Sequence, residues 1–250
     1  MSANHDYTRY YNHFHRQDRW QRQTSKRSYF PYIRSLDIPK SARILDIGCG
    51  QGFFVEAMKD LGYSDVSGVD TSSEQIRIAS SNVADCFHIE DLQSWAKSGV
   101  TYDFIFLFDV LEHVPINDQV EFLTCVKGCL AQNGMLFVRV PNANAAFASR
   151  FRWGDWTHHC SFTEHSIDYV LFAAGFSNIK VLEDHFGRLP IWVPRPSLAS
   201  ILRWIARAFR RLVAMGELGT QVGWTIPLTP NLVAKVAPDT SSCLRSTPID

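Results

Sequence analysis

The sequence lacks several features that would assign it to a specialised class of protein. Its 250 residues contain no run of about 18 apolar side chains, so we expect no membrane-spanning helix. Lys plus Arg equals Asp plus Glu, so no overall positive field favours nucleic acid. The first residues, MSANHDYTRYYNHFHRQ, lack the apolar stretch of a secretory signal.

The cysteines show no recognisable pattern. The six of them, at positions 49, 86, 125, 129, 160 and 243, form no C-x-x-C pair and no regular framework. We therefore expect reduced thiols and an intracellular, cytoplasmic protein. The hydrophobic content of 46% is ordinary for a globular fold with a sizeable core.

The chain divides into four parts by composition. These are a basic, aromatic segment 1–41, a core 42–184, a basic insert 185–230, and a last strand and tail 231–250. Strand-like runs occupy 43–47, 65–70, 85–89, 102–108, 134–140, 178–184 and 231–236, and helical patterns occupy 53–62, 73–82, 116–131 and 163–174. This alternation predicts an α/β fold, with a doubly wound and mostly parallel sheet.

A glycine-rich loop follows the first strand. The strand ends near Asp46, and the loop reads Gly48-Cys49-Gly50-Gln51-Gly52. Glycines allow a tight turn and let a ligand lie against the backbone. The dinucleotide fingerprint G-x-G-x-x-G would need a glycine where Phe53 stands, and no Gly-Lys-Ser/Thr follows. The loop therefore does not favour binding of a pyrophosphate.

A second acid follows the next strand. Asp70 ends 68-GVD-70, where doubly wound folds place a carboxylate on ribose hydroxyls. A ligand with a ribose and no pyrophosphate is predicted, and S-adenosylmethionine fits both conditions. Two alternatives stay open: the glycines form only a tight turn, or Asp70 caps the next helix, as Thr71, Ser72 or Ser73 also could.

Taken together, these segments resemble the class I S-adenosylmethionine-dependent methyltransferases. The resemblance is carried by 44-ILDIGCGQG-52, 68-GVD-70, 103-DFIFLFDVLEHVP-115 and 133-NGMLFVRVPN-142, and is strongest to the ubiquinone-biosynthesis and surface-glycan branches with a Leu-Glu-His-Val turn. It implies a Rossmann-like sheet of seven strands, the seventh antiparallel between the fifth and sixth.

The resemblance also implies a set of cofactor contacts. Asp46 and the loop residues Gly48, Cys49, Gly50 and Gly52 would contact the methionine end of the cofactor. Asp70 and Thr71 would bind the ribose, and Asp91 and Leu92 would flank the adenine. Phe108 and Asp109 would form the floor of the pocket. Asp91 could instead simply start a helix over 92–98.

Candidate residues for the acceptor follow the fourth and fifth strands. His113 is suited to remove a proton from a hydroxyl near neutral pH, or is only a turn residue. In 153-WGDWTHHCSFTEHS-166, Asp155 and His158 stand among tryptophans, which suits a sugar or flat acceptor. Asn142 either borders the acceptor or only stabilises the turn after the fifth strand. We expect no metal at His158, His159 and Cys160, since adjacent residues rarely share one ion.

The two remaining segments are basic. Residues 1–41 are expected to form helices that cover the cofactor, with Tyr11 as a candidate contact to its carboxylate. Residues 185–216 contain six arginines and no acid, and an amphipathic helix is predicted over 197–215. Its apolar face is expected to pack on the domain or on a dimer partner with the arginines solvated; the alternative is peripheral contact with the inner face of an anionic membrane.

The sequence thus predicts a methyltransferase that acts on oxygen of a small-molecule or glycan-type acceptor, with no nucleic-acid partner. His113, with Asp155 or His158, would orient or deprotonate the acceptor. Two alternatives remain: a catalytically inactive, methyltransferase-like binding module, and an NAD-dependent oxidoreductase, against which Phe53 argues.

Overall fold

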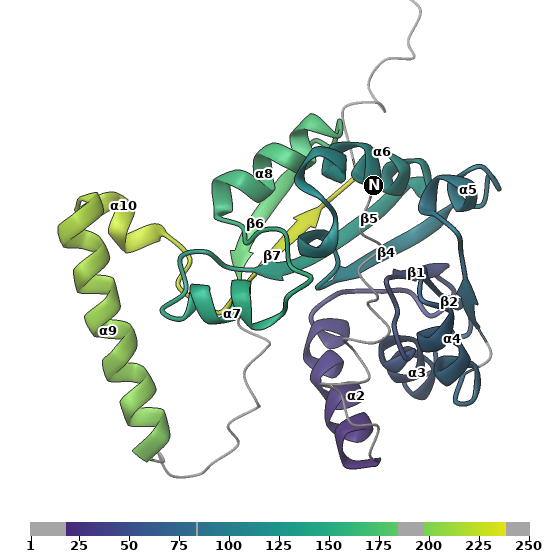
Figure 1. Cartoon of the computed structure of the whole chain (residues 1–250), viewed down its shortest axis with the longest axis horizontal. Coiled ribbons are helices and arrows are strands. Elements are labelled where there is room, and N and C mark those ends of the chain that lie inside the picture. Colours follow the sequence, from purple (N-terminus) through teal and green to yellow (C-terminus); the bar gives the residue numbers. More distant parts are fainter. Residues whose placement is uncertain (1–18, 84, 185–197, 239–250) are drawn as a thin grey trace, which may run out of the picture.

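A central sheet organises the protein. The computed structural model describes residues 19–83, 85–184 and 198–238 (Figure 1). Its seven strands lie in the order β3-β2-β1-β4-β5-β7-β6. They are β1 (Ile44–Ile47), β2 (Val66–Asp70), β3 (Cys86–His88), β4 (Tyr102–Phe108), β5 (Leu130–Pro141), β6 (Ile179–Glu183) and β7 (Asn231–Val236). Only β7 runs antiparallel to its neighbours, β5 and β6, which confirms the expected fold class and the place of the last strand.

Helices cover both faces of the sheet (Figure 1). On one face pack α2 (Arg19–Arg34), α3 (Phe53–Asp60) and α4 (Ser73–Ser80), and on the other α5 (Leu92–Ala96), α6 (Gln119–Gly128) and α8 (Glu164–Ala173). The 3-10 helices η1 (Leu111–His113) and η2 (Ile116–Asp118) follow β4, and α7 (Ala148–Gly154) follows β5. Helices α9 (Leu198–Leu218) and α10 (Thr220–Thr225) lie between β6 and β7.

The apolar strands are buried because both faces are covered. All four residues of β1 are buried. Along the central strands, alternate side chains enter opposite cores: Ile44 and Phe106 pack with α2, α3 and α4, whereas Leu45 and Ile105 pack with α5, α6 and α8. Because β1, β2, β4 and β5 run parallel, their carboxyl ends meet at one edge of the sheet, where a doubly wound fold binds its ligand.

Several predicted boundaries were wrong. The helix expected over 116–131 ends at Gly128, because Leu130 pairs with Tyr102 of β4 and begins β5 early. Helices α7 and α10 were not predicted, and each begins without a side-chain cap, at Phe147 and Gly219 respectively. Neither start carries the Ser, Thr, Asp or Asn that marks a helix in a sequence.

Helix α2 belongs to the first, basic segment. Its Arg22 and Lys26 pair with Glu56 of α3 at 2.9 and 3.0 Å, and Tyr32 packs edge-on against Phe108 and Phe137. The helix therefore lies over the face of the sheet that carries Phe108. Tyr11, Cys243 and the insert residues 185–197 lie outside the described residues.

Candidate functional site

The glycine loop turns sharply at the end of β1. Gly48, Gly50 and Gly52 have φ angles of 73°, 51° and 77°, in the left-handed region that favours glycine. A Cβ atom at Gly48 would collide with the side chain of Val110, and one at Gly52 would lie 2.9 Å from Val83. The backbone conformation therefore favours glycine at all three positions, and space also requires it at Gly48 and Gly52.

Asp70 connects this loop to the end of β2. Its carboxylate accepts hydrogen bonds from the Gly50 N–H at 2.9 Å and the Ser72 N–H at 2.8 Å. Ser72, and not Asp70, caps α4, since its side chain accepts from Gln75. Burial raises the pKa of Asp70, and these backbone N–H groups oppose that rise. Thr71, the next residue, is exposed, and its carbonyl lies 3.2 Å from His88 Nε2.

Asp46 is a buried acid beside the loop. It is 3% exposed, and burial raises its pKa well above the usual value, with the nearby Cys86 and Asp70 adding to the rise. Cys49 is also buried within the loop, at 8% exposed. A charged carboxylate in this position is destabilised by burial and then by neighbouring negative charge, so a cationic ligand group would bind well there.

Phe108 and Asp109 lie at the end of β4. Asp109 has a φ of 56°, which is unusual for a residue other than glycine, and its carboxylate accepts from Arg139 Nε at 2.9 Å. Arg139 Nη1 also donates to the Tyr32 hydroxyl at 3.3 Å, and Phe108 packs beneath the guanidinium. Sequence reasoning missed Arg139, although an arginine inside the apolar strand FVRV was a signal.

Asp91 starts a helix. It is the N-cap of α5, and its carboxylate accepts from the backbone N–H of Ser94 at 2.6 Å and from its hydroxyl at 3.1 Å. This confirms the capping alternative for Asp91. Leu92 is buried in the core. Contact of either residue with adenine stays a prediction.

His113 belongs to a hydrogen-bonded chain across the acceptor side. Its Nδ1 atom lies 2.8 Å from the Thr157 hydroxyl, which in turn donates to Asp155 Oδ1 at 2.6 Å. The Thr157 hydroxyl has a single proton, so Nδ1 of His113 must donate to its oxygen. The other ring nitrogen, Nε2, then keeps its lone pair. Burial, followed by the charge of His158, lowers the pKa of His113 to about 4, so the ring is neutral near pH 7.

Glu112, which sequence reasoning missed, lies beside this histidine. It is fully buried, and neither carboxylate oxygen has a hydrogen-bond partner among the described residues. Burial, followed by the charge of Asp109, raises its pKa well above the usual value. Glu112, His113 and His158 each offer one ligand atom, and these atoms all lie within 4.8 Å of one another.

The structure thus brings together the three predicted acceptor-side residues from two segments. The His113 and His158 rings are 4.6 Å apart, and His158 Nδ1 lies 2.9 Å from the Phe151 carbonyl. The backbone N–H of His159 donates to the Glu112 carbonyl at 2.7 Å, which fixes the second segment against η1. No regular sequence spacing links His113 with His158, so only the fold could reveal this cluster.

Two further predictions concerned the rim of this region. Asn142 is fully buried and donates to the carbonyls of Thr229 at 2.7 Å and Pro227 at 3.1 Å, so it anchors the start of β7. Trp153 and Trp156 are 67% and 74% exposed, although the Arg152 guanidinium lies 4.1 Å from the centre of the Trp153 ring and covers one of its faces. Thr163 caps α8 and forms a capping box with Ser166.

Comparisons with known proteins agree with this architecture. Residues 11–181 match the family described as "Methyltransferase domain". The ubiquinone biosynthesis O-methyltransferase of Rhizobium johnstonii is 36% identical over 136 residues, which cover 46% of this chain and 53% of that protein. The chain spans about half the length of the curated relatives it matches.

Two solved structures share the fold. A SAM-dependent methyltransferase from Archaeoglobus fulgidus has a TM-score of 0.63 and 19% identity, covering 94% of this chain and all of that one. The plantazolicin methyltransferase BpumL, in complex with SAH, has a TM-score of 0.55 and 19% identity, covering 93% of this chain and 89% of that one. Since the family match spans most of the chain, the protein belongs to the methyltransferase domain family.

Proposed function

We propose that the protein transfers a methyl group from S-adenosylmethionine to an oxygen of a small-molecule or glycan-type acceptor. The observation that carries this proposal is the pairing of two sites at one edge of the sheet. The glycine loop with Asp46 and Asp70 follows β1 and β2, and the chain from His113 through Thr157 to Asp155 follows β4 and β5. The relatives named as O-methyltransferases support oxygen as the target.

The cofactor would lie along the glycine loop. Asp46, whose pKa burial raises, suits the positive charge at the methionine end. A carboxylate has about four lone-pair sites, so Asp70 can hold Gly50 and Ser72 and still accept from ribose hydroxyls. Adenine would lie toward Asp91 and Leu92, and Phe108 with Asp109 would form the pocket floor.

The methyl transfer needs one proton acceptor. Bound S-adenosylmethionine would supply an activated methyl group to the acceptor oxygen and would leave as the thioether, with the electron pair of the broken carbon–sulfur bond on sulfur. The hydroxyl proton moves to Nε2 of His113, which is unprotonated because Nδ1 donates to Thr157. Asp155 fixes this tautomer through Thr157, and positioning supplies much of the remaining rate enhancement.

The buried Glu112 carboxylate favours a second arrangement of the acceptor side, in which a cation is bound. A divalent cation bound by Glu112, His113 and His158 would compensate that buried charge and could also hold the acceptor oxygen. The two arrangements differ in one measurement. Turnover that survives a strong chelator supports the proton-transfer role of His113, and turnover lost with chelator and restored by Mn²⁺ supports the cation.

The test of the proposed function is formation of S-adenosylhomocysteine by the full chain with hydroxylated acceptors: catechols and quinone precursors, sugar nucleotides and phenols. Cofactor binding without turnover on any of them would favour an inactive binding module. Binding of NAD in preference to S-adenosylmethionine would favour an oxidoreductase. We place the activity in the cytoplasm.

A further inference from the structure

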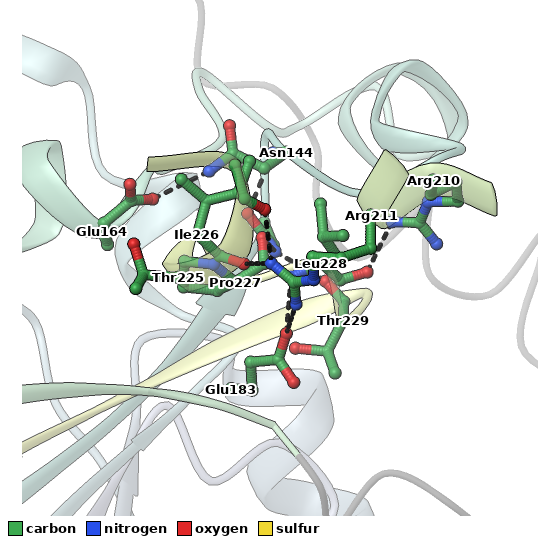
Figure 2. Close-up of polar contacts among 12 residues, drawn as sticks. Asn144, Glu164, Glu183, Arg210, Arg211, Thr225, Ile226, Pro227, Leu228 and Thr229 are labelled. Carbon is green, nitrogen blue, oxygen red and sulfur yellow. Dashed lines mark hydrogen bonds and ion pairs between the residues drawn. The ribbon is translucent and has the colours of Figure 1, made fainter. Parts of the chain in front are cut away.

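Helix α9 is held by its arginine side. Arg211 Nη1 donates to the carbonyls of Gly223 at 3.0 Å and Ile226 at 2.6 Å, and Arg210 Nη2 donates to Leu228 at 2.6 Å (Figure 2). Glu183 of β6 accepts from Arg211 and from the Leu228 N–H. These bonds join α9 to α10, to the turn after α10 and to the sheet.

This orientation reverses one expectation from the sequence. Arg210 and Arg211 are not simply solvated, and the apolar face does not pack on the domain. Its side chains are exposed instead: Leu198 72%, Ile201 44%, Leu202 55%, Ile205 50%, Phe209 66%, Leu212 66% and Val213 41%. At 100° per residue these positions form one broad stripe along the helix. Figure 1 shows α9 at the outside of the molecule, away from the sheet.

The charges of α9 are almost all positive, and helical periodicity places the arginines on the side opposite the stripe. From Leu198 to Gly216 the helix contains four arginines and no acid, and Glu217 is its one acidic residue. Trp204 of α9 and Trp224 of α10 are also exposed, at 71% and 67%. A broad apolar face, an arginine-rich opposite face and exposed tryptophans are typical of helices that lie in the headgroup region of an anionic bilayer.

A second copy of the chain fits this surface less well. Paired helices take their register from charges of opposite sign beside the apolar seam, and α9 has Ala206, Ala208, Val213 and Met215 in those flanking positions. An anionic bilayer needs no register, and the net positive charge of the helix is attracted to it. No described helix is long and apolar enough to cross a membrane, so α9 would lie parallel to the surface.

We propose that α9 binds the surface of an anionic lipid bilayer through its stripe of Leu202, Ile205, Phe209 and Leu212. The stripe enters the acyl boundary, and the basic character of the helix adds attraction to anionic headgroups. The bonds of Arg210 and Arg211 hold the stripe outward. This proposal is independent of the catalytic activity.

The experiment is flotation of the full chain with vesicles of phosphatidylcholine alone or with one quarter phosphatidylglycerol. We expect flotation with the anionic vesicles, weaker flotation at high salt, and a loss on the order of tenfold or more in the double variant Phe209→Asp, Leu212→Asp. Phe172→Asp on α8 is the matched control, because Phe172 is 67% exposed and Phe209 66%. The control should float like the unaltered protein.

Three outcomes would overturn the proposal. The first is an unaltered protein that never floats with anionic vesicles. The second is an equal loss in Phe172→Asp and in the double variant. The third is a dimer, measured by analytical ultracentrifugation, that the double variant dissociates while neither form floats; α9 would then bind a second copy. Circular dichroism shows whether each variant is folded.

Discussion

The Thr157 hydroxyl lies between His113 Nδ1, at 2.8 Å, and Asp155 Oδ1, at 2.6 Å. Because the hydroxyl donates to Asp155, it must accept from His113, and this leaves Nε2 as the basic nitrogen. A residue that the sequence did not single out therefore decides which side of the imidazole can take a proton.

Replacing His113 with Ala should lower turnover by about 10²–10⁴-fold if it is the base, and Thr157→Val should lower it by about tenfold because the ring loses its orienting partner. Affinity for S-adenosylhomocysteine, measured by calorimetry, should not change in either variant. His165→Ala is the control, since that side chain is 91% exposed. Wild-type turnover in His113→Ala would exclude histidine as the base.

Asp70→Asn should weaken cofactor binding by about 1–3 kcal/mol, because hydrogen bonds to a charged group are lost from the ribose and from Gly50. Calorimetric titration with S-adenosylhomocysteine measures this. Asp118→Asn, an exposed acid on η2, is the control and should bind normally. Equal affinities in both variants would remove Asp70 from the cofactor site.

The free energy of unfolding should depend on pH through His113. Its pKa falls from 6.5 to about 4 on folding, so between these values the unfolded chain binds a proton that the folded chain does not. The contribution of His113 to the free energy of unfolding is therefore fully present above pH 6.5. It decreases as the pH falls toward 4, by on the order of 1–3 kcal/mol. Urea unfolding of the wild type and of His113→Gln tests this: the decrease should be smaller in the variant, and parallel curves would contradict it.

Glu112 should give the opposite dependence. Its folded pKa is raised, so its favourable contribution is fully present below about pH 4.5 and is lost as the pH rises through the folded value. Glu112→Gln should therefore be more stable than the wild type at pH 8 and lose this advantage in acid. Glu121→Gln, an exposed glutamate on α6, should behave like the wild type.

The same pair of variants tests cation binding. If a divalent cation binds Glu112, His113 and His158, Mn²⁺ should raise the melting temperature of the wild type and of Glu121→Gln but not of Glu112→Gln. An equal rise in all three would place the ion elsewhere.

The glycine loop offers a test of packing. Gly50→Ala should lower the free energy of unfolding by about 1–2 kcal/mol, because a Cβ atom is unfavourable in a left-handed backbone. No collision adds to this, since no atom lies within 4 Å of that Cβ. Gly48→Ala adds a collision with Val110 and should cost about 1–3 kcal/mol more. Thermal unfolding measures both, and equal losses would mean that Val110 moves aside.

The sequence by itself determined the order of the strands, most of the helices between them and the place of the glycine loop. It could do so because apolar periodicity and glycine spacing are local properties, and because strands buried on both faces read as continuous apolar runs such as IFLF. Asp46 and Asp70 were predicted as cofactor residues for the same reason, since each lies at or next to the end of a strand that the pattern marks.

Only the tertiary structure decided which distant residues meet. Glu112 and His113 approach Thr157 and His158 because β4 and β5 are parallel neighbours whose following segments share one edge of the sheet. Periodicity likewise could not show which face of α9 is turned toward the domain. A helical pattern shows that one face is apolar and the other basic, but the carbonyl groups that bind Arg210 and Arg211 come from Gly223, Ile226 and Leu228, and these contacts turn the apolar face outward.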